Sequence, residues 1–203
     1  MSTLNSTFAA RSPYASLPVI PTEGSGVVVR DRDGLGLATV LARKGKQEAL
    51  AQRVRERFGI ELPQGPHRAT TGDTAFAGTG PGTWLALHER SGNSFAPALL
   101  AAIGDLASIS DQSDGLAVLR LSGPKIRDAL CKLIPIDLHP GAFKVGGVAS
   151  TIAAHIGATL WRIEDDRDGS AVFEIAVFRS LADSFWSALS ESAAEFGFRV
   201  AGR

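Results

Sequence analysis

Three aspartates gather around one polar segment and are the first candidates for chemistry: Asp105, Asp111 and Asp114. Two carboxyl groups can act as general acid and general base when burial raises the pKa of one of them. The segment from Asp111 to Gly115 is also an ordinary turn sequence, because Asp side chains accept hydrogen bonds from nearby backbone amides. We favour the turn and predict no catalytic pair here.

Two further segments imitate ligand-binding loops. Gly72–Gly82 is rich in glycine, but a phosphate site needs a helix after the loop, and here strands flank the glycines. Glu164–Gly169 resembles the start of a calcium-binding loop, yet Ile175 stands where the bidentate Glu is due. We predict a hairpin at each place.

The remaining reactive side chains show no arrangement typical of a site. The four histidines lack the spacing of metal ligands, and we expect His88 and His155 to be structural. Cys131 lies beside the apolar stripe of a short helix, which predicts a packed thiol rather than a nucleophile. The tryptophans stand in apolar segments and indicate core or interface positions. The sequence thus predicts no catalytic, cofactor-binding or metal-ligating residue. The other residues considered are His67, His139, Trp84, Trp161 and Trp186.

Periodic apolar residues predict the elements that position these side chains. The first half reads as β-α-β-β-α-β, the split pattern of a ferredoxin-like unit. Its predicted strands and helices are 35–41, 45–58, 74–78, 83–88, 93–103 and 107–111.

The predicted elements of the second half follow a similar order, although the sequence similarity between the two halves is too weak to call them a repeat. Gly123 and Pro124 end its first strand and begin a helix. The predicted elements are strand 115–121, helix 124–134, strands 148–154, 157–163 and 171–177, helix 181–196 and a closing strand at 198–200.

The fold class predicted from this order is α+β, with two ferredoxin-like α/β halves packed as one unit. We expect one domain over residues 34–200, divided into halves of about 34–110 and 111–200. Residues 1–33 are rich in Ser, Thr, Pro and Gly and predict an extended arm. Tyr14 and neighbouring apolar residues could anchor that arm on a partner, and a frayed terminus is the alternative.

Composition narrows the class of protein. The 203 residues include 21 basic and 21 acidic side chains, so the formal net charge is zero. This balance disfavours nucleic acid and membrane surfaces as partners. The single cysteine excludes an intrachain disulfide, no apolar run approaches the roughly 18 residues of a membrane span, and no signal peptide is recognisable. We expect a cytoplasmic protein. A chain with zero net charge has little charge repulsion to prevent association, which suits a subunit of a complex.

An ordered series of short segments carries a family resemblance. The main one is SDQSDGLAVLRLSGP from Ser110 to Pro124, followed by Pro135-Ile-Asp-Leu138. The series resembles the gamma subunits of heterotetrameric sarcosine oxidases, from about Arg11 to Gly197. Supporting matches are Arg11-Ser-Pro13, Gly80-Pro-Gly-Thr-Trp-Leu85, Thr151-Ile-Ala-Ala-His-Ile156, Leu160-Trp-Arg162 and Arg179-Ser180 with Trp186.

The resemblance implies an aminomethyltransferase-like, folate-binding fold and a place in a bacterial complex of alpha, beta, gamma and delta chains. Such a complex oxidatively demethylates sarcosine to glycine with oxygen and passes the one-carbon unit to tetrahydrofolate. In that family FAD, FMN and NAD reside with the alpha and beta chains and zinc with delta. The gamma chain holds no cofactor and has no assigned catalytic residue, so a structural, non-catalytic subunit is expected.

Two other functions stay open at this point. A stand-alone folate-binding protein of the aminomethyltransferase type would need an acidic residue, Asp111 or Asp114, to hold the pterin ring in a pocket. The chain is short for such an enzyme, which carries a further C-terminal barrel. A small-ligand sensor of ferredoxin-like type is the third possibility.

Overall fold

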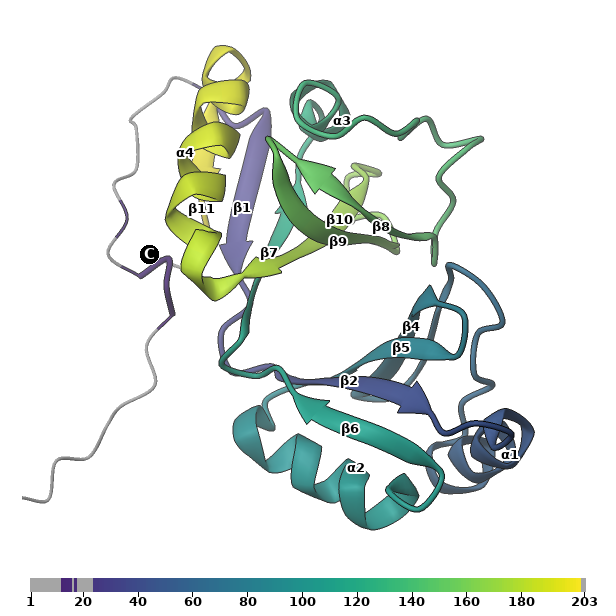
Figure 1. The fold of residues 1–203 in the computed structure, drawn as a ribbon. Helices are drawn as coiled ribbons and strands as arrows, with labels where there is room; N and C mark the ends of the chain where they lie inside the picture. Colours follow the sequence, from purple (N-terminus) through teal and green to yellow (C-terminus); the bar gives the residue numbers. More distant parts are fainter. Residues whose placement is uncertain (1–11, 16, 18–23, 202–203) are drawn as a thin grey trace, which may run out of the picture.

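The computed structural model describes residues 12–15, 17 and 24–201, and these contain two mixed layers of helix and sheet packed face to face (Figure 1). The rest of the predicted arm lies outside the described residues. In the described part, no helix is long and apolar enough to cross a membrane.

A five-stranded sheet is built from the first half of the chain, in the order β3-β4-β5-β2-β6. All its neighbouring strands pair antiparallel. Apart from β3, which the sequence analysis missed, this is the strand order of a ferredoxin-like unit. Its elements are β2 (Gly36–Ala42), α1 (Gln47–Phe58), β3 (Arg68–Thr71), β4 (Thr74–Gly80), β5 (Thr83–His88), the 3-10 turn Gly92–Ser94, α2 (Phe95–Ile103) and β6 (Ala107–Asp111).

A six-stranded sheet is built mainly from the second half, in the order β11-β1-β7-β10-β9-β8. The helix predicted at 124–134 is shorter in the structure, where regular α-helix covers only Ile126–Leu130 (α3). Its elements are β1 (Val27–Asp31), β7 (Leu116–Ser122), α3 (Ile126–Leu130), β8 (Val148–Ala153), β9 (Ile156–Ile163), β10 (Val172–Phe178), α4 (Ala182–Ala193) and β11 (Phe198–Val200), with 3-10 turns at Arg179–Leu181 and Ala194–Phe196.

Strand β1 differs from the sequence analysis, which placed residues 27–31 inside the arm. β1 pairs antiparallel with β7 and parallel with β11, and thus fills the position of the fourth ferredoxin-like strand in the second sheet. Val27 and Val29 are fully buried there. Tyr14, also from the predicted arm, is buried and packs its ring 5.8 Å from that of Trp186 on α4. β1 is therefore part of the six-stranded sheet, whereas the predicted division placed its residues in the arm.

Three clusters of buried side chains account for the layers. The outer face of the six-stranded sheet packs against α3 and α4, and the outer face of the five-stranded sheet packs against α1 and α2. The third cluster joins the inner faces of the two sheets. The α+β prediction with two halves packed as one unit is confirmed. The third cluster includes Leu37, Leu85, Val118, Trp161 and Ala176.

Two backbone segments of the five-stranded layer cross at very short range at Gly78 on β4. A β-carbon built on Gly78 would lie 2.1 Å from the carbonyl oxygen of Gly65. The amide of Gly78 donates to the carbonyl of His67 at 2.9 Å, so the loop before β3 is held against β4. Only glycine permits this approach.

We predict that Gly78→Ala lowers the free energy of unfolding by about 2 kcal/mol, because backbone must move to make room for the methyl group. Gly65→Ala is the matched control, since a β-carbon there meets nothing within 4 Å. Urea denaturation of both variants checks this expectation. Equal free energies of unfolding for the two variants would contradict the close approach of the two backbone segments at Gly78.

Candidate functional site

The three candidate aspartates make separate contacts. An Asp111 carboxylate oxygen accepts the amide of Ser113 at 2.9 Å, which confirms the predicted turn. Asp114 Oδ2 accepts from Asn93 at 2.9 Å, and Asp105 lies 3.5 Å from Arg53. All three side chains are exposed, and each has a different partner in these contacts.

Both motif-like loops are hairpin connections, as predicted. Gly72–Gly82 contains β4 and the turn that leads to β5, with no helix following. In the Glu164–Gly169 loop the amide of Gly169 donates to the carbonyl of Asp166, and the amide of Ser170 donates to the carboxylate of Asp168. Across the described residues, no group of three or more His, Cys, Asp and Glu side chains is placed to hold a metal ion.

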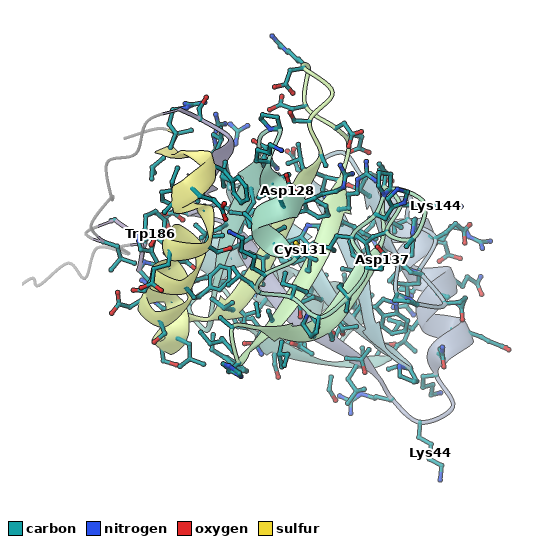
Figure 2. All side chains as sticks on the ribbon, turned by 90° about the horizontal axis from the view of Figure 1, so that it is seen from above. Lys44, Asp128, Cys131, Asp137, Lys144 and Trp186 are labelled. Carbon is teal, nitrogen blue, oxygen red and sulfur yellow. The ribbon has the colours of Figure 1, made fainter. Side chains whose placement is uncertain are left out.

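The prediction of a packed thiol is wrong. Cys131 is exposed, and its Sγ lies 3.1 Å from the carbonyl oxygen of Asp128 on the same helical turn (Figure 2). Cys131 directly follows α3 with helical dihedral angles, and it lies about 100° around the turn from the buried Leu130. His88 bonds the carbonyl of Glu89, and His155 occupies the β8–β9 turn with φ of 68°, which are structural positions. The three tryptophans are buried, as expected.

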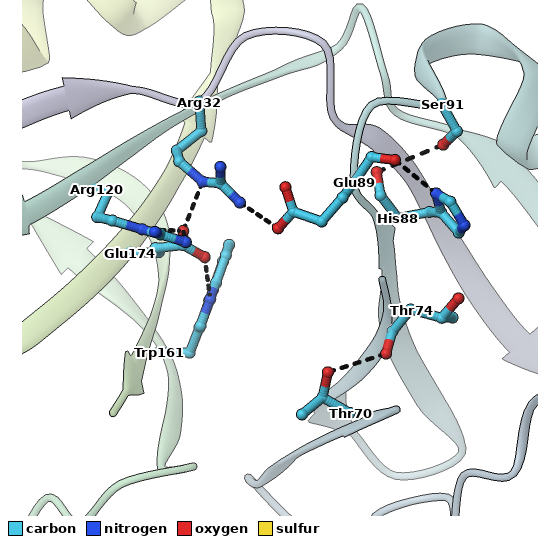
Figure 3. Close-up of polar contacts among 9 residues, drawn as sticks. All are labelled: Arg32, Thr70, Thr74, His88, Glu89, Ser91, Arg120, Trp161 and Glu174. Atoms are coloured by element: carbon cyan, nitrogen blue, oxygen red, sulfur yellow. Dashed lines mark hydrogen bonds and ion pairs between the residues drawn. The ribbon is translucent and has the colours of Figure 1, made fainter. Parts of the chain in front are cut away.

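The most unusual polar group in the described molecule is Glu174 on β10, on the inner face of the six-stranded sheet. Its side chain is only 3 % exposed. Oε1 accepts from Nε of Arg32 at 2.7 Å and from Nε of Arg120 at 2.8 Å, and Oε2 accepts from the indole of Trp161 at 2.8 Å (Figure 3). Arg32 also pairs with Glu89, which follows β5. We call Glu174, Arg32, Arg120, Trp161 and Glu89 the inter-sheet ion cluster.

Charge determines the protonation state within this cluster. Burial alone would raise the pKa of Glu174, but Arg120 and Arg32 outweigh burial and hold that pKa below its usual value. Burial would likewise lower the pKa of Arg32, and the carboxylates of Glu174 and Glu89 raise it instead. Glu174 is therefore ionised at neutral pH and has donors on both oxygens. Such a carboxylate is unsuited to proton transfer, and its role is to join the two sheets.

Arg68 on β3 stands near the same charges. Burial lowers its pKa, with Glu174 as the largest opposing influence. Its Nε is buried without a hydrogen-bond partner among the described residues. Arg68 is only partly exposed, and it adds positive charge at the rim of the cluster.

A hollow with different chemistry opens on the inner face of the same sheet. It has a volume of about 530 Å³, and no charged residue lines it. We call it the apolar trough. Its lining residues are Leu116, Ser150, Thr151, Ile152, Gly157, Ala158, Thr159, Ala176 and Phe178. A second hollow of about 320 Å³ mixes Arg30, Arg120 and Arg199 with Glu164, Asp165 and Asp166, so it has no dominant sign of charge.

Sequence reasoning missed the ion cluster, although a signal was present. Glu174 is the one charge in the strand VFEIAVF, and Arg120 is the one charge in LAVLRLS. A lone charge inside a strand with apolar residues on both faces indicates a buried partner of opposite sign. The two residues lie opposite each other in register across β7 and β10.

Comparisons of sequence place the chain among known proteins. The family described as "Sarcosine oxidase, gamma subunit family" matches residues 43–195. The chain is 34 % identical over 167 residues to the sarcosine oxidase subunit gamma of Corynebacterium sp. (strain P-1), covering 78 % of this chain and 80 % of that one. It is 33 % identical over 102 residues to an aminomethyltransferase of Bacteroides fragilis, but spans only 26 % of that protein.

Comparisons of structure agree. A chain of the heterotetrameric sarcosine oxidase from Corynebacterium sp. U-96 matches with a TM-score of 0.76 and 27 % identity, covering 92 % of this chain and 96 % of that chain. The aminomethyltransferase T of the glycine cleavage system from Bartonella henselae matches with a TM-score of 0.62 at 12 % identity, over 86 % of this chain and 47 % of that one. The second match concerns the fold alone, and it confirms the predicted aminomethyltransferase-like architecture.

We predict that Glu174→Gln lowers the free energy of unfolding by about 3 kcal/mol, because two arginines lose their buried counter-charge. Glu61→Gln is the matched control, since the Arg55–Glu61 pair is well exposed and should change stability by less than about 0.5 kcal/mol. Chemical denaturation at pH 7 measures both. A loss as small as that of the control would show that the cluster is not a stabilising contact.

The same residue predicts a dependence of stability on pH. The folded-state pKa of Glu174 lies below its unfolded value of about 4.3, so its contribution is complete above that pH and is lost as pH falls through the folded pKa. Denaturation midpoints measured from pH 6 down to pH 3 should therefore fall more steeply for the wild type than for Glu174→Gln. Parallel curves would refute the assignment.

Proposed function

This chain belongs to the sarcosine oxidase gamma subunit family, and from that membership we propose that it is a structural, non-catalytic subunit of a sarcosine oxidase complex. Its partners are the alpha, beta and delta subunits, with no nucleic acid and no membrane involved, and the complex works in the cytoplasm. The complex oxidatively demethylates sarcosine to glycine and passes the one-carbon unit to tetrahydrofolate.

The cofactors belong to other chains in this proposal. FAD, FMN and NAD reside with alpha and beta, and zinc resides with delta. The residues of the apolar trough do not fit a bound folate. The apolar trough offers no charged side chain for the pterin ring or the glutamate carboxylates, and Asp111 and Asp114 are exposed residues that do not line it.

The observation that carries the proposal is the state of Glu174. It is a buried carboxylate between the two sheets, and burial is one way to prepare a carboxyl group for acid–base chemistry. Two arginines and an indole already use both of its oxygens, and its pKa is held low. A buried carboxylate whose bonds join the two halves of its own chain supports a structural role.

The alternative is a stand-alone folate-binding protein related to the aminomethyltransferases. Sequence identity of 33 % to the Bacteroides fragilis protein favours it, but that match spans 47 % of this chain and about a quarter of the relative. The gamma subunit relatives match over more than three quarters of this chain.

We expect the tagged chain, co-expressed with candidate alpha, beta and delta chains, to elute as one complex that consumes oxygen when sarcosine is added. The chain expressed alone should oxidise no sarcosine and should give no saturable signal in titrations with tetrahydrofolate up to 1 mM, on the order of the weakest specific affinities. Gel filtration, oxygen uptake and calorimetry provide the measurements. Elution without partners, or micromolar folate binding by the chain alone, would favour the alternative.

A further inference from the structure

Strand β8 is an edge strand with unusual chemistry. The two sheets have edge strands β3, β6, β8 and β11 in the described chain. Arg68 stands on β3, Asp111 on β6 and Arg199 on β11, whereas β8 reads VASTIA, with neither a charge nor a proline. Proteins use charged residues and prolines to prevent exposed edges from pairing with other chains. Of these strands, β8 alone lacks that protection in its sequence, and only its start is covered, by the loop before β3.

The backbone of β8 presents hydrogen-bonding groups to its open side. Val148 donates its amide to the carbonyl of Pro66, away from β9. Alternate residues of an antiparallel strand bond in opposite directions, so the amides of Ser150 and Ile152 also point away from β9. Ser150 and Ile152 are both exposed, which leaves this part of the edge accessible.

The apolar trough begins at the same edge. Ile152 lies opposite Gly157 in register, and Phe178 on β10 lies on the far side of β9 from it. A β-carbon on Gly157 would meet nothing within 4 Å, so a hollow separates the two large side chains. Ile152 is 49 % and Phe178 57 % exposed, although both point to the face that is core elsewhere in the sheet. An exposed apolar surface of this kind is typical of an interaction site.

We propose that the β8 edge and the apolar trough bind an extended, uncharged segment of a sister subunit, which adds to β8 as a further strand. Its backbone bonds the amides and carbonyls at Ser150 and Ile152, and its apolar side chains fill the hollow between Ile152 and Phe178. This mode of recognition combines main-chain bonds for affinity with side-chain pockets for specificity. The proposal rests on the proposed function, because that function supplies the sister subunits.

The chemistry of the surface selects this occupant. The lining carries no charge, so a charged peptide, a nucleic acid or a folate carboxylate gains no ion pair there. In the proposed complex of alpha, beta, gamma and delta chains, this chain occurs once, so no second copy is present to pair with. The apolar trough lies on the inner face of the six-stranded sheet, and the five-stranded sheet covers another part of that same face. A partner bound in the trough therefore extends the buried layer.

The test uses the complete complex and two substitutions in the surface, Ile152→Lys and Phe178→Lys. Each places a charge in the hollow, and we expect each to reduce the amount of this chain retained by a tagged sister subunit at least tenfold. Leu100→Lys is the matched control, because Leu100 is 58 % exposed on α2, on the outer side of the five-stranded sheet. It should leave retention unchanged. Thermal unfolding of the variants separates loss of binding from loss of folding.

Hydrogen exchange supplies a second readout that does not depend on any variant. In the wild-type complex, the amides of Ser150 and Ile152 should exchange at least tenfold more slowly than exposed amides of the edge strand β6. Equally fast exchange on both edges would overturn strand addition.

Other outcomes separate this inference from the proposed function. If the wild-type chain binds no sister subunit, the proposed function fails. If the wild type and all three variants are retained equally, only the docking surface fails. Should the chain alone form a dimer that Ile152→Lys dissociates, the occupant is a second copy and the inference is overturned.

Discussion

The structure depends on one buried carboxylate that is shared between two sheets. Glu174 lies on the inner face of the six-stranded sheet, and Arg32 connects it to Glu89 of the five-stranded layer. Arg32 belongs to the short connection between β1 and β2, which is where the chain passes from one sheet to the other. The same contact thus fixes the connection and the relative position of the two layers. A charge this deeply buried is tolerable only with all of its bonds satisfied.

Much of the fold was predictable because it follows from periodicity. The alternation in LATVL and the stripe of Leu50 and Val54 define β2 and α1, and both are where the sequence placed them. β1 was not predictable in the same way, since VVVRD is short and follows a segment rich in Pro and Gly. Its identity as a strand depends on burial between β7 and β11, which are distant in sequence. Tertiary contacts decide such short segments.

Around the candidate residues, the local turns were predictable from sequence. Asx turns and hairpins follow from local sequence, and the structure has them at Asp111 and at Gly72–Gly82. Cys131 was misplaced because it lies about 100° around the helical turn from Leu130, away from the stripe that includes the buried Ile134. The ion cluster draws on β7, β9, β10 and two connections, so no local window contains it. Only the isolated charges at Arg120 and Glu174 pointed to it.

The strand order also has a consequence for how the nascent chain acquires its structure. The five-stranded sheet uses residues 36–111 without interruption, so it can form while the ribosome is still adding later residues. The six-stranded sheet places Val27 beside Phe198, so β1 must wait through almost the whole of translation for its parallel neighbour. During that interval the apolar strand β1 lacks one of its two neighbours in the sheet. A contact so distant along the sequence makes this half the slower one to assemble.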